Sequence, residues 1–180
     1  MNQFQTAAIS LFLAQTIGGS VADHVQTLPS YTAVFCKFAG QFDDHKVKMA
    51  MDAAFSKIDR YLVSHHLQRV PDTYPTMYVS VFSEETASLS GEVAIDIEPT
   101  SEVGSPQEGI RIGKTQSGRV ARFETTAPYG ESNEFYEDIA AWMVAHGLKR
   151  KSEAWEDYVR QGNEVAPRDR LTYIYYAIGS

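Results

Sequence analysis

Cysteine is almost absent from this chain of 180 residues, which has only Cys36. A single thiol excludes a disulfide framework, and this fits a reducing cytoplasm. Cys36 lies in the apolar run 31–38, where a buried thiol is expected rather than a nucleophile. Because 43% of the residues are hydrophobic, the chain can form one globular domain without a metal or a disulfide.

Basic residues are also scarce, with 16 Lys and Arg against 23 Asp and Glu. A net charge of -7 repels a phosphate backbone, so direct nucleic-acid binding is not expected.

Long hydrophobic runs are missing too. The apolar stretch 7–14 is too short to span a bilayer and no Lys or Arg precedes it, so no membrane partner is expected. We interpret residues 1–20 as an N-terminal extension with a short docking helix ending at Gly18-Gly19.

Motifs for common chemistries are absent as well. The five histidines lack the spacing of a metal site, and the chain has no Walker loop and no Gly-x-Ser-x-Gly elbow. Neither a cofactor nor a metal is therefore expected. His65 and His146 fall at matching places near the ends of two predicted helices, which favours a structural role. Asp96 and Glu98 share one face of a predicted strand and are interpreted as solvated, with a weak cation site as the alternative.

What the chain does contain is a repeat of its own pattern. Residues 55–67 align without gaps on residues 136–148, so that Ile58 matches Ile139 and Leu67 matches Leu148. Both stretches carry apolar residues at intervals of three and four, as in a helix that covers a sheet. Strand-like runs lie at 31–40, 76–83 and 91–98 around the first helix, and at 119–130, 154–160 and 171–178 around the second. The alignment continues through Tyr78-Val79 against Tyr158-Val159 after a slip of one residue.

These elements predict an α+β fold of two β-α-β-β repeats, at about 21–100 and about 109–180. Gly104, Pro106 and Gly109 mark the linker between them. One unit alone would leave an open sheet edge, so we expect the copies to pair about a pseudo-twofold axis within one domain, residues 21–180. The seam between them should form a central groove, which is a usual place for a ligand.

Four segments form a recognisable pattern along the chain. They are residues 25–40, the turn Pro128-Tyr129-Gly130, the strand Trp155-Glu-Asp-Tyr-Val159, and residues 170–175. In this order they resemble the GyrI-like small-molecule-binding family, which also supplies the effector-binding domains of AraC-type and MerR-type multidrug-responsive regulators. The likeness covers about residues 22–179. The turn departs from the family in having Ala127 where glycine is more common.

The resemblance implies a stand-alone cytoplasmic module that binds amphipathic, cationic aromatic molecules for sensing or sequestration. In that family the glutamate of a Glu-x-Tyr pattern reaches into the groove, and the pattern here is Glu156-Asp157-Tyr158. Strand alternation places Glu156 and Tyr158 on one face, and a carboxylate beside aromatic rings suits an organic cation. Thr76 is the expected counterpart of Glu156 in the first copy. The candidate ligand-binding residues are Glu156, Tyr158, Tyr129, Trp142, Thr76 and Tyr78.

Two other functions stay open. Some members of the resembled family are hydrolases that open electrophilic rings, and in that reading Glu156 acts as a general base on a water molecule. A protein-binding inhibitor of the gyrase-inhibitor type is the second alternative, with a protein partner or a homodimer. Direct transcription control is not expected, because about twenty residues before the first repeat are too few for a helix-turn-helix domain.

Overall fold

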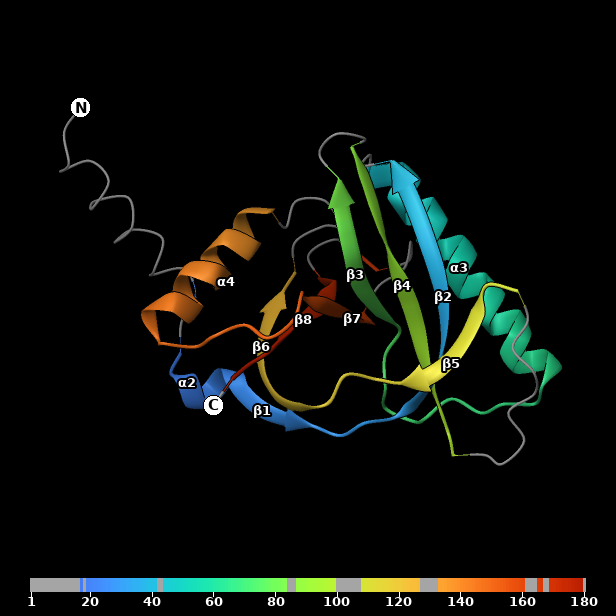
Figure 1. Cartoon of the computed structure of the whole chain (residues 1–180), viewed down its shortest axis with the longest axis horizontal. Helices are drawn as coiled ribbons and strands as arrows, with labels where there is room; N and C mark the ends of the chain where they lie inside the picture. The colour runs from blue at the N-terminus through green and yellow to red at the C-terminus, as the bar shows by residue number, and fades with distance from the viewer. Residues whose placement is uncertain are drawn as a thin grey trace.

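A single antiparallel sheet organises the molecule (Figure 1). The computed structural model describes residues 17, 19–41, 44–83, 87–99, 108–126, 133–160, 165–166 and 169–179. Within these residues, eight strands pair in the order β1-β6-β8-β7-β3-β4-β2-β5. The predicted α+β class is confirmed.

Each half of the chain contributes the same succession of elements. The first half has β2 (Thr32–Gln41), α3 (Asp44–Ser64), β3 (Thr76–Ser83) and β4 (Ser88–Ile97). The second half has β6 (Gly118–Thr125), α4 (Asn133–Ala145), β7 (Trp155–Arg160) and β8 (Leu171–Ala177). The strand-helix-strand-strand unit predicted from the repeat is therefore present twice.

The strand order shows how the two halves are related. Outward from the central β3–β7 pair, one side reads β3, β4, β2 and the other reads β7, β8, β6. Isolated bridges join Arg69 to Ile97 and Arg150 to Ile178, and these two pairs are offset by 81 positions, as are the aligned helices. β4 and β8 keep this offset, but β3 and β7 do not: Thr76 matches Trp155, and the register shift at Val79/Val81 matches that at Tyr158/Arg160, so the offset there is 79. The slip is therefore two residues and not the predicted one.

The outermost strand on each side comes from the other half. β1 (Val25–Leu28) precedes the strand-helix-strand-strand unit of the first half but pairs with β6, with Val25 opposite Ala121. β5 (Ile110–Lys114) follows the linker but pairs with β2, with Ile110 opposite Cys36. These short strands are not among the six predicted ones. The exchange ties the two halves into one sheet.

Helices α3 and α4 cover the same face of the sheet, which we call the helix-covered face. Its buried side chains form two clusters, one around Ile58 of α3 and one around Ile139 of α4. The other face, called the open face, carries two smaller clusters that include Phe35 and Trp155. Because successive side chains of a strand point to opposite faces, alternation decides which residues reach each layer.

The two helices also end alike. The Nδ1 atoms of His65 and His146 lie 3.0 and 2.8 Å from the carbonyl oxygens of Tyr61 and Trp142, respectively. The His65 imidazole also stacks on the Tyr61 ring, and the His146 imidazole stacks on the Trp142 ring. Each carbonyl already accepts the backbone N–H of the same histidine, so the imidazole adds a second contact that fixes the end of the helix. The structural role predicted for both histidines is confirmed.

Most of the N-terminal extension, including its predicted docking helix, lies outside the described residues. A four-residue helix, α2 (Val21–His24), begins directly after it. Ser20 caps this helix through its hydroxyl and its backbone N–H, which both donate to the Asp23 carboxylate. No helix in the described part of the chain combines the length and the apolarity needed to cross a membrane.

Candidate functional site

A cavity of about 190 Å³ opens on the open face, where β3 and β7 join the two halves. We call it the central cavity. Both repeats contribute to its wall, and most of the lining side chains are aromatic or acidic. The lining residues that define its chemistry are Thr76, Tyr78, Asp96, Trp155, Asp157 and Tyr175.

The pseudo-twofold axis passes through the wall of this cavity. Thr76 and Asp157 pair directly across β3 and β7, and the symmetry-related pair is Tyr78 and Trp155, because the two strands are offset by 79 residues. The counterpart of Thr76 is therefore Trp155, that of Asp157 is Tyr78, and the predicted match of Thr76 with Glu156 is wrong. The Thr76 hydroxyl donates to Asp157 Oδ1 at 2.6 Å. The pseudo-symmetric backbone thus carries unlike side chains at matching positions, so the cavity wall is asymmetric.

Asp157 is a half-buried acid among tyrosines. Burial raises the pKa of its carboxyl to about 6, although hydrogen bonds from Thr76 and Tyr175 favour the charged form. Burial also raises the pKa of the Tyr78 and Tyr175 hydroxyls, so both stay protonated at neutral pH. Among the described residues, no Lys or Arg forms an ion pair with Asp157.

Asp96 is a second acid in the same cavity. Its side chain faces away from the isoleucine core, as predicted, yet only 8% of its surface is exposed. The interpretation of Asp96 as solvated is therefore wrong, because the open face is hollowed into a cavity at this point and is not flat surface. Burial, and then the nearby charge of Asp157, raises the pKa of Asp96 to about 7.

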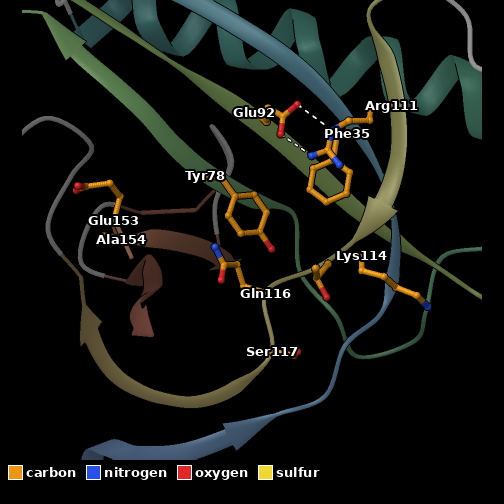
Figure 2. A pocket seen from close by; sticks show the side chains of 10 residues that line it. Phe35, Tyr78, Glu92, Arg111, Lys114, Gln116, Ser117, Glu153 and Ala154 are labelled. Atoms are coloured by element: carbon orange, nitrogen blue, oxygen red, sulfur yellow. Dashed lines mark hydrogen bonds and ion pairs between the residues drawn. The ribbon is translucent and has the colours of Figure 1, made fainter. Parts of the chain in front are cut away.

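A larger cavity of about 530 Å³ adjoins the central one and shares the Tyr78 wall with it (Figure 2). There Arg111 donates to both carboxylate oxygens of Glu92 and lies 3.9 Å above the Phe35 ring. Arg122, on β6, pairs with Glu124 at 3.1 Å. Both arginines thus have glutamate partners of their own.

Glu156 lies on the opposite side of the sheet from the central cavity. Its neighbours across the strands are Met77 and Ile174, which belong to the helix-covered core. The Tyr136 hydroxyl of α4 donates to its Oε1 atom, and 7% of Glu156 is exposed. Burial raises the pKa of this carboxyl, against hydrogen bonds from Tyr136 and Tyr158.

The structure brings together only part of the predicted set. Thr76 and Tyr78 line the central cavity. Trp142, a residue of α4, is buried in the core of the second half. Tyr158 packs against the core of the first half. Tyr129 lies outside the described residues.

Sequence reasoning missed Asp157, Asp96, Trp155 and Tyr175 as cavity residues. The sequence held a partial signal for Asp157. Strand alternation placed it on the face opposite Glu156, but the helix offset of 81 does not locate it, because the segment from Arg150 to β7 is two residues shorter than the segment from Arg69 to β3.

Asp96 should make stability depend on pH. Its folded pKa lies above the ordinary value of 3.8, so its neutral form stabilises the fold below about pH 4 and this stability is lost as pH rises through about 7. We expect Asp96→Asn to reduce the fall in unfolding free energy between pH 5 and 8 by about 2 kcal/mol, after allowance for solvent in the cavity. Urea denaturation at both pH values measures this. The control is Glu98→Gln, an exposed acid directly after the end of β4. An unchanged pH slope in Asp96→Asn would contradict the assignment.

The duplicated unit and the acidic, aromatic cavity at its seam define a class of protein, a small-molecule-binding domain built on one antiparallel sheet. The chain belongs to the GyrI-like family: residues 24–178 match the GyrI-like small molecule binding domain. The predicted resemblance is thereby confirmed. Comparison with curated proteins finds no significant match.

Solved structures share the fold at low sequence identity. The C-terminal domain of EcmrR has a TM-score of 0.70 and 13% identity, over 86% of this chain and 95% of that one. A hydrolase from Listeria innocua has a TM-score of 0.58 and 13% identity, over 86% and 90% of the two chains. SAV2435, solved bound to tetraphenylphosphonium, has a TM-score of 0.54 and 14% identity, over 86% and 92%.

Proposed function

We propose that this protein binds small cationic aromatic molecules in the central cavity, for sensing or sequestration, with Asp157 as the anionic contact. One observation carries the proposal: a half-buried carboxylate stands at the seam of the two repeats among aromatic rings, with no cation paired to it in the described part of the chain. A carboxylate removed from water is stabilised by an opposite charge.

The aromatic rings suit the rest of such a ligand. Trp155 lies between Tyr78 and Tyr175, with ring centroids 6.1 and 5.4 Å away and ring planes inclined by 28° and 13°. A flat cation placed against these rings gains cation–π attraction and apolar contact together. A neutral ring of the same size gains only the apolar part. Tetraphenylphosphonium, the molecule bound to SAV2435, is itself an aromatic cation.

The geometry supports binding over hydrolysis by Glu156. A general base must come within hydrogen-bond reach of the water that it activates. The Glu156 carboxylate lies on the helix-covered face and accepts a hydrogen bond from Tyr136, so it does not face the central cavity. The hydrolase name of one structural neighbour belongs to that protein.

Two neighbouring residues on opposite faces of β7 provide the test. Asp157→Asn keeps the shape and the Thr76 contact but removes the charge, so we expect ethidium and tetraphenylphosphonium to bind about thirtyfold more weakly, or about 2 kcal/mol. Glu156→Gln, the matched control, should leave both affinities unchanged. Neutral N-phenyl-1-naphthylamine should bind both variants as it binds the wild type. Quenching of tryptophan fluorescence measures all three, since Trp155 lines the cavity.

Equal weakening of charged and neutral probes by Asp157→Asn would contradict the proposal. A loss in Glu156→Gln as large as that in Asp157→Asn would contradict it as well, because the two carboxylates lie on opposite faces of the sheet.

A further inference from the structure

We infer that the central cavity holds two separate anionic contacts, Asp157 and Asp96, and that its ligand carries two cationic groups at the ends of an aromatic frame. This rests on the proposed function, in which Asp157 binds one cation. Asp96 then binds the second.

The strand register places the two acids at different ends of the cavity. Thr76 on β3 pairs with Asp157 on one side and with Ala94 of β4 on the other. Asp96 lies two residues beyond Ala94 on the same face. Two strand spacings across and two residues along put the Cα atoms of Asp96 and Asp157 about 12 Å apart. Aspartate side chains are too short to close that distance, so each carboxylate can contact its own cation.

The two carboxylates differ in how well the protein satisfies them. Asp157 accepts hydrogen bonds from the hydroxyls of Thr76 and Tyr175. Asp96 is 92% buried, because 8% of it is exposed, and its side chain has no hydrogen bond or ion pair within the described ranges. In the described part of the chain, the fully enclosed side-chain atoms without a partner are Asp138 Oδ1 and Arg170 Nε, so the Asp96 oxygens open onto the cavity, where a donor from outside the chain can reach them.

Other charges around the cavity do not supply that donor. Arg111 pairs with Glu92, Arg122 pairs with Glu124, and Lys114, which lines the adjoining cavity, donates to the Thr32 hydroxyl. Asp72, the remaining charged residue that lines the central cavity, is itself acidic. The local charge is therefore negative, and it suits a dication better than a monocation.

The cavity also limits the size of the aromatic part of the ligand that joins the two cationic groups. Its volume of about 190 Å³ exceeds the roughly 150 Å³ in which a buried benzene fits, so one or two rings fit between the two charges. A bulkier cation such as tetraphenylphosphonium would extend into the adjoining cavity, which shares the Tyr78 wall. Tyr31, Tyr74 and Trp155 line the central cavity and offer ring surfaces for the aromatic frame. The expected ligand is a compact aromatic dication.

Three probes of one shape and different charge test the inference. They are neutral 4,4′-dimethylbiphenyl, the monocation N-methyl-4-(4-methylphenyl)pyridinium, and the dication N,N′-dimethyl-4,4′-bipyridinium. None of them titrates near neutral pH, so any change with a variant reports on the protein. Calorimetric titration of the full chain at pH 8 gives each affinity. The variants are Asp96→Asn and its control Glu98→Gln, an exposed acid two residues further along.

The wild type should bind the dication about tenfold more tightly than the monocation. Asp96→Asn should lower that ratio to about one and change the affinity for the monocation by less than about twofold, whereas Glu98→Gln should keep the ratio of the wild type. A ratio of one in the wild type, with the monocation bound more tightly than the neutral probe, would overturn the second contact and leave the proposed function standing. An undiminished ratio in Asp96→Asn would do the same. If neither cation binds more tightly than the neutral probe, both proposals fail.

Discussion

Residues 22–102, expressed without the second half, should show no cooperative unfolding transition. In the full sheet β1 pairs with β6, β2 with β5, and β3 with β7, and each of these partners lies in the second half. The isolated first half would therefore leave three strand edges unpaired and uncover the apolar side chains at the seam. Circular dichroism during heating measures the loss, which should be complete.

A complementation experiment is the control. Residues 108–180 supply the missing partners, so mixing the two fragments during refolding should restore a cooperative transition. The full chain cut once near Gly104 should also keep its transition, since the sheet does not need the linker peptide bonds. A monomeric first half that melts cooperatively on its own would show that the exchanged strands are not required for folding.

Gly91→Ala should destabilise the protein by about 3 kcal/mol or more. Gly91 lies inside β4, where a Cβ atom would collide with the carbonyl oxygen of Tyr78 and come within 2.9 Å of the Phe38 ring. A backbone oxygen cannot rotate away as a side chain can, so β3 and β4 must separate. They meet here beside a register shift between Val79 and Val81. Overpacking in a closed core costs typically 1–3 kcal/mol, and a backbone clash adds to that.

Urea denaturation measures the unfolding free energy of Gly91→Ala and of a control, Gly179→Ala, at a position where a new methyl group has room. At Gly179 the nearest atom to a new Cβ is Lys151 Cε at 3.4 Å, the flexible end of a side chain, so the control should change stability by less than about 0.5 kcal/mol. A loss below about 1 kcal/mol in Gly91→Ala would mean that β3 and β4 adjust without strain.

Much of this fold could be predicted because the sequence contains two copies of the same strand-helix-strand-strand unit. The helix alignment and the flanking alternation located the six strands of the two units, and β3 has the predicted bounds, Thr76–Ser83. β1 and β5 could not be predicted in the same way. They contain four and five residues, too few for a clear alternation, and their pairing depends on distant partners.

The site shows a different limit. Alternation correctly separated Glu156 and Tyr158 from Trp155 and Asp157, but period two does not say which set faces the groove. Tertiary packing decides that, because the Tyr136 hydroxyl of α4 reaches Glu156 on the helix-covered face. The resemblance to the GyrI-like family led instead to the prediction that Glu156 faces the groove. The burial of Asp96 likewise depends on a hollow that no single strand encodes.

The exchanged outer strands also affect the order in which a growing chain can fold. Until residues 110–114 have left the ribosome, β2 has an unpaired edge, and β1 waits for residues 118–121 before it can pair at all. Pairing across so much sequence is slow, since loop closure must precede the contacts that reward it. A nascent chain of about one hundred residues therefore exposes strand edges to neighbouring chains. Completion of the second half covers the long edges of β2 and β6 and leaves only the short strands β5 and β1 at the rims, where they are poor templates for aggregation.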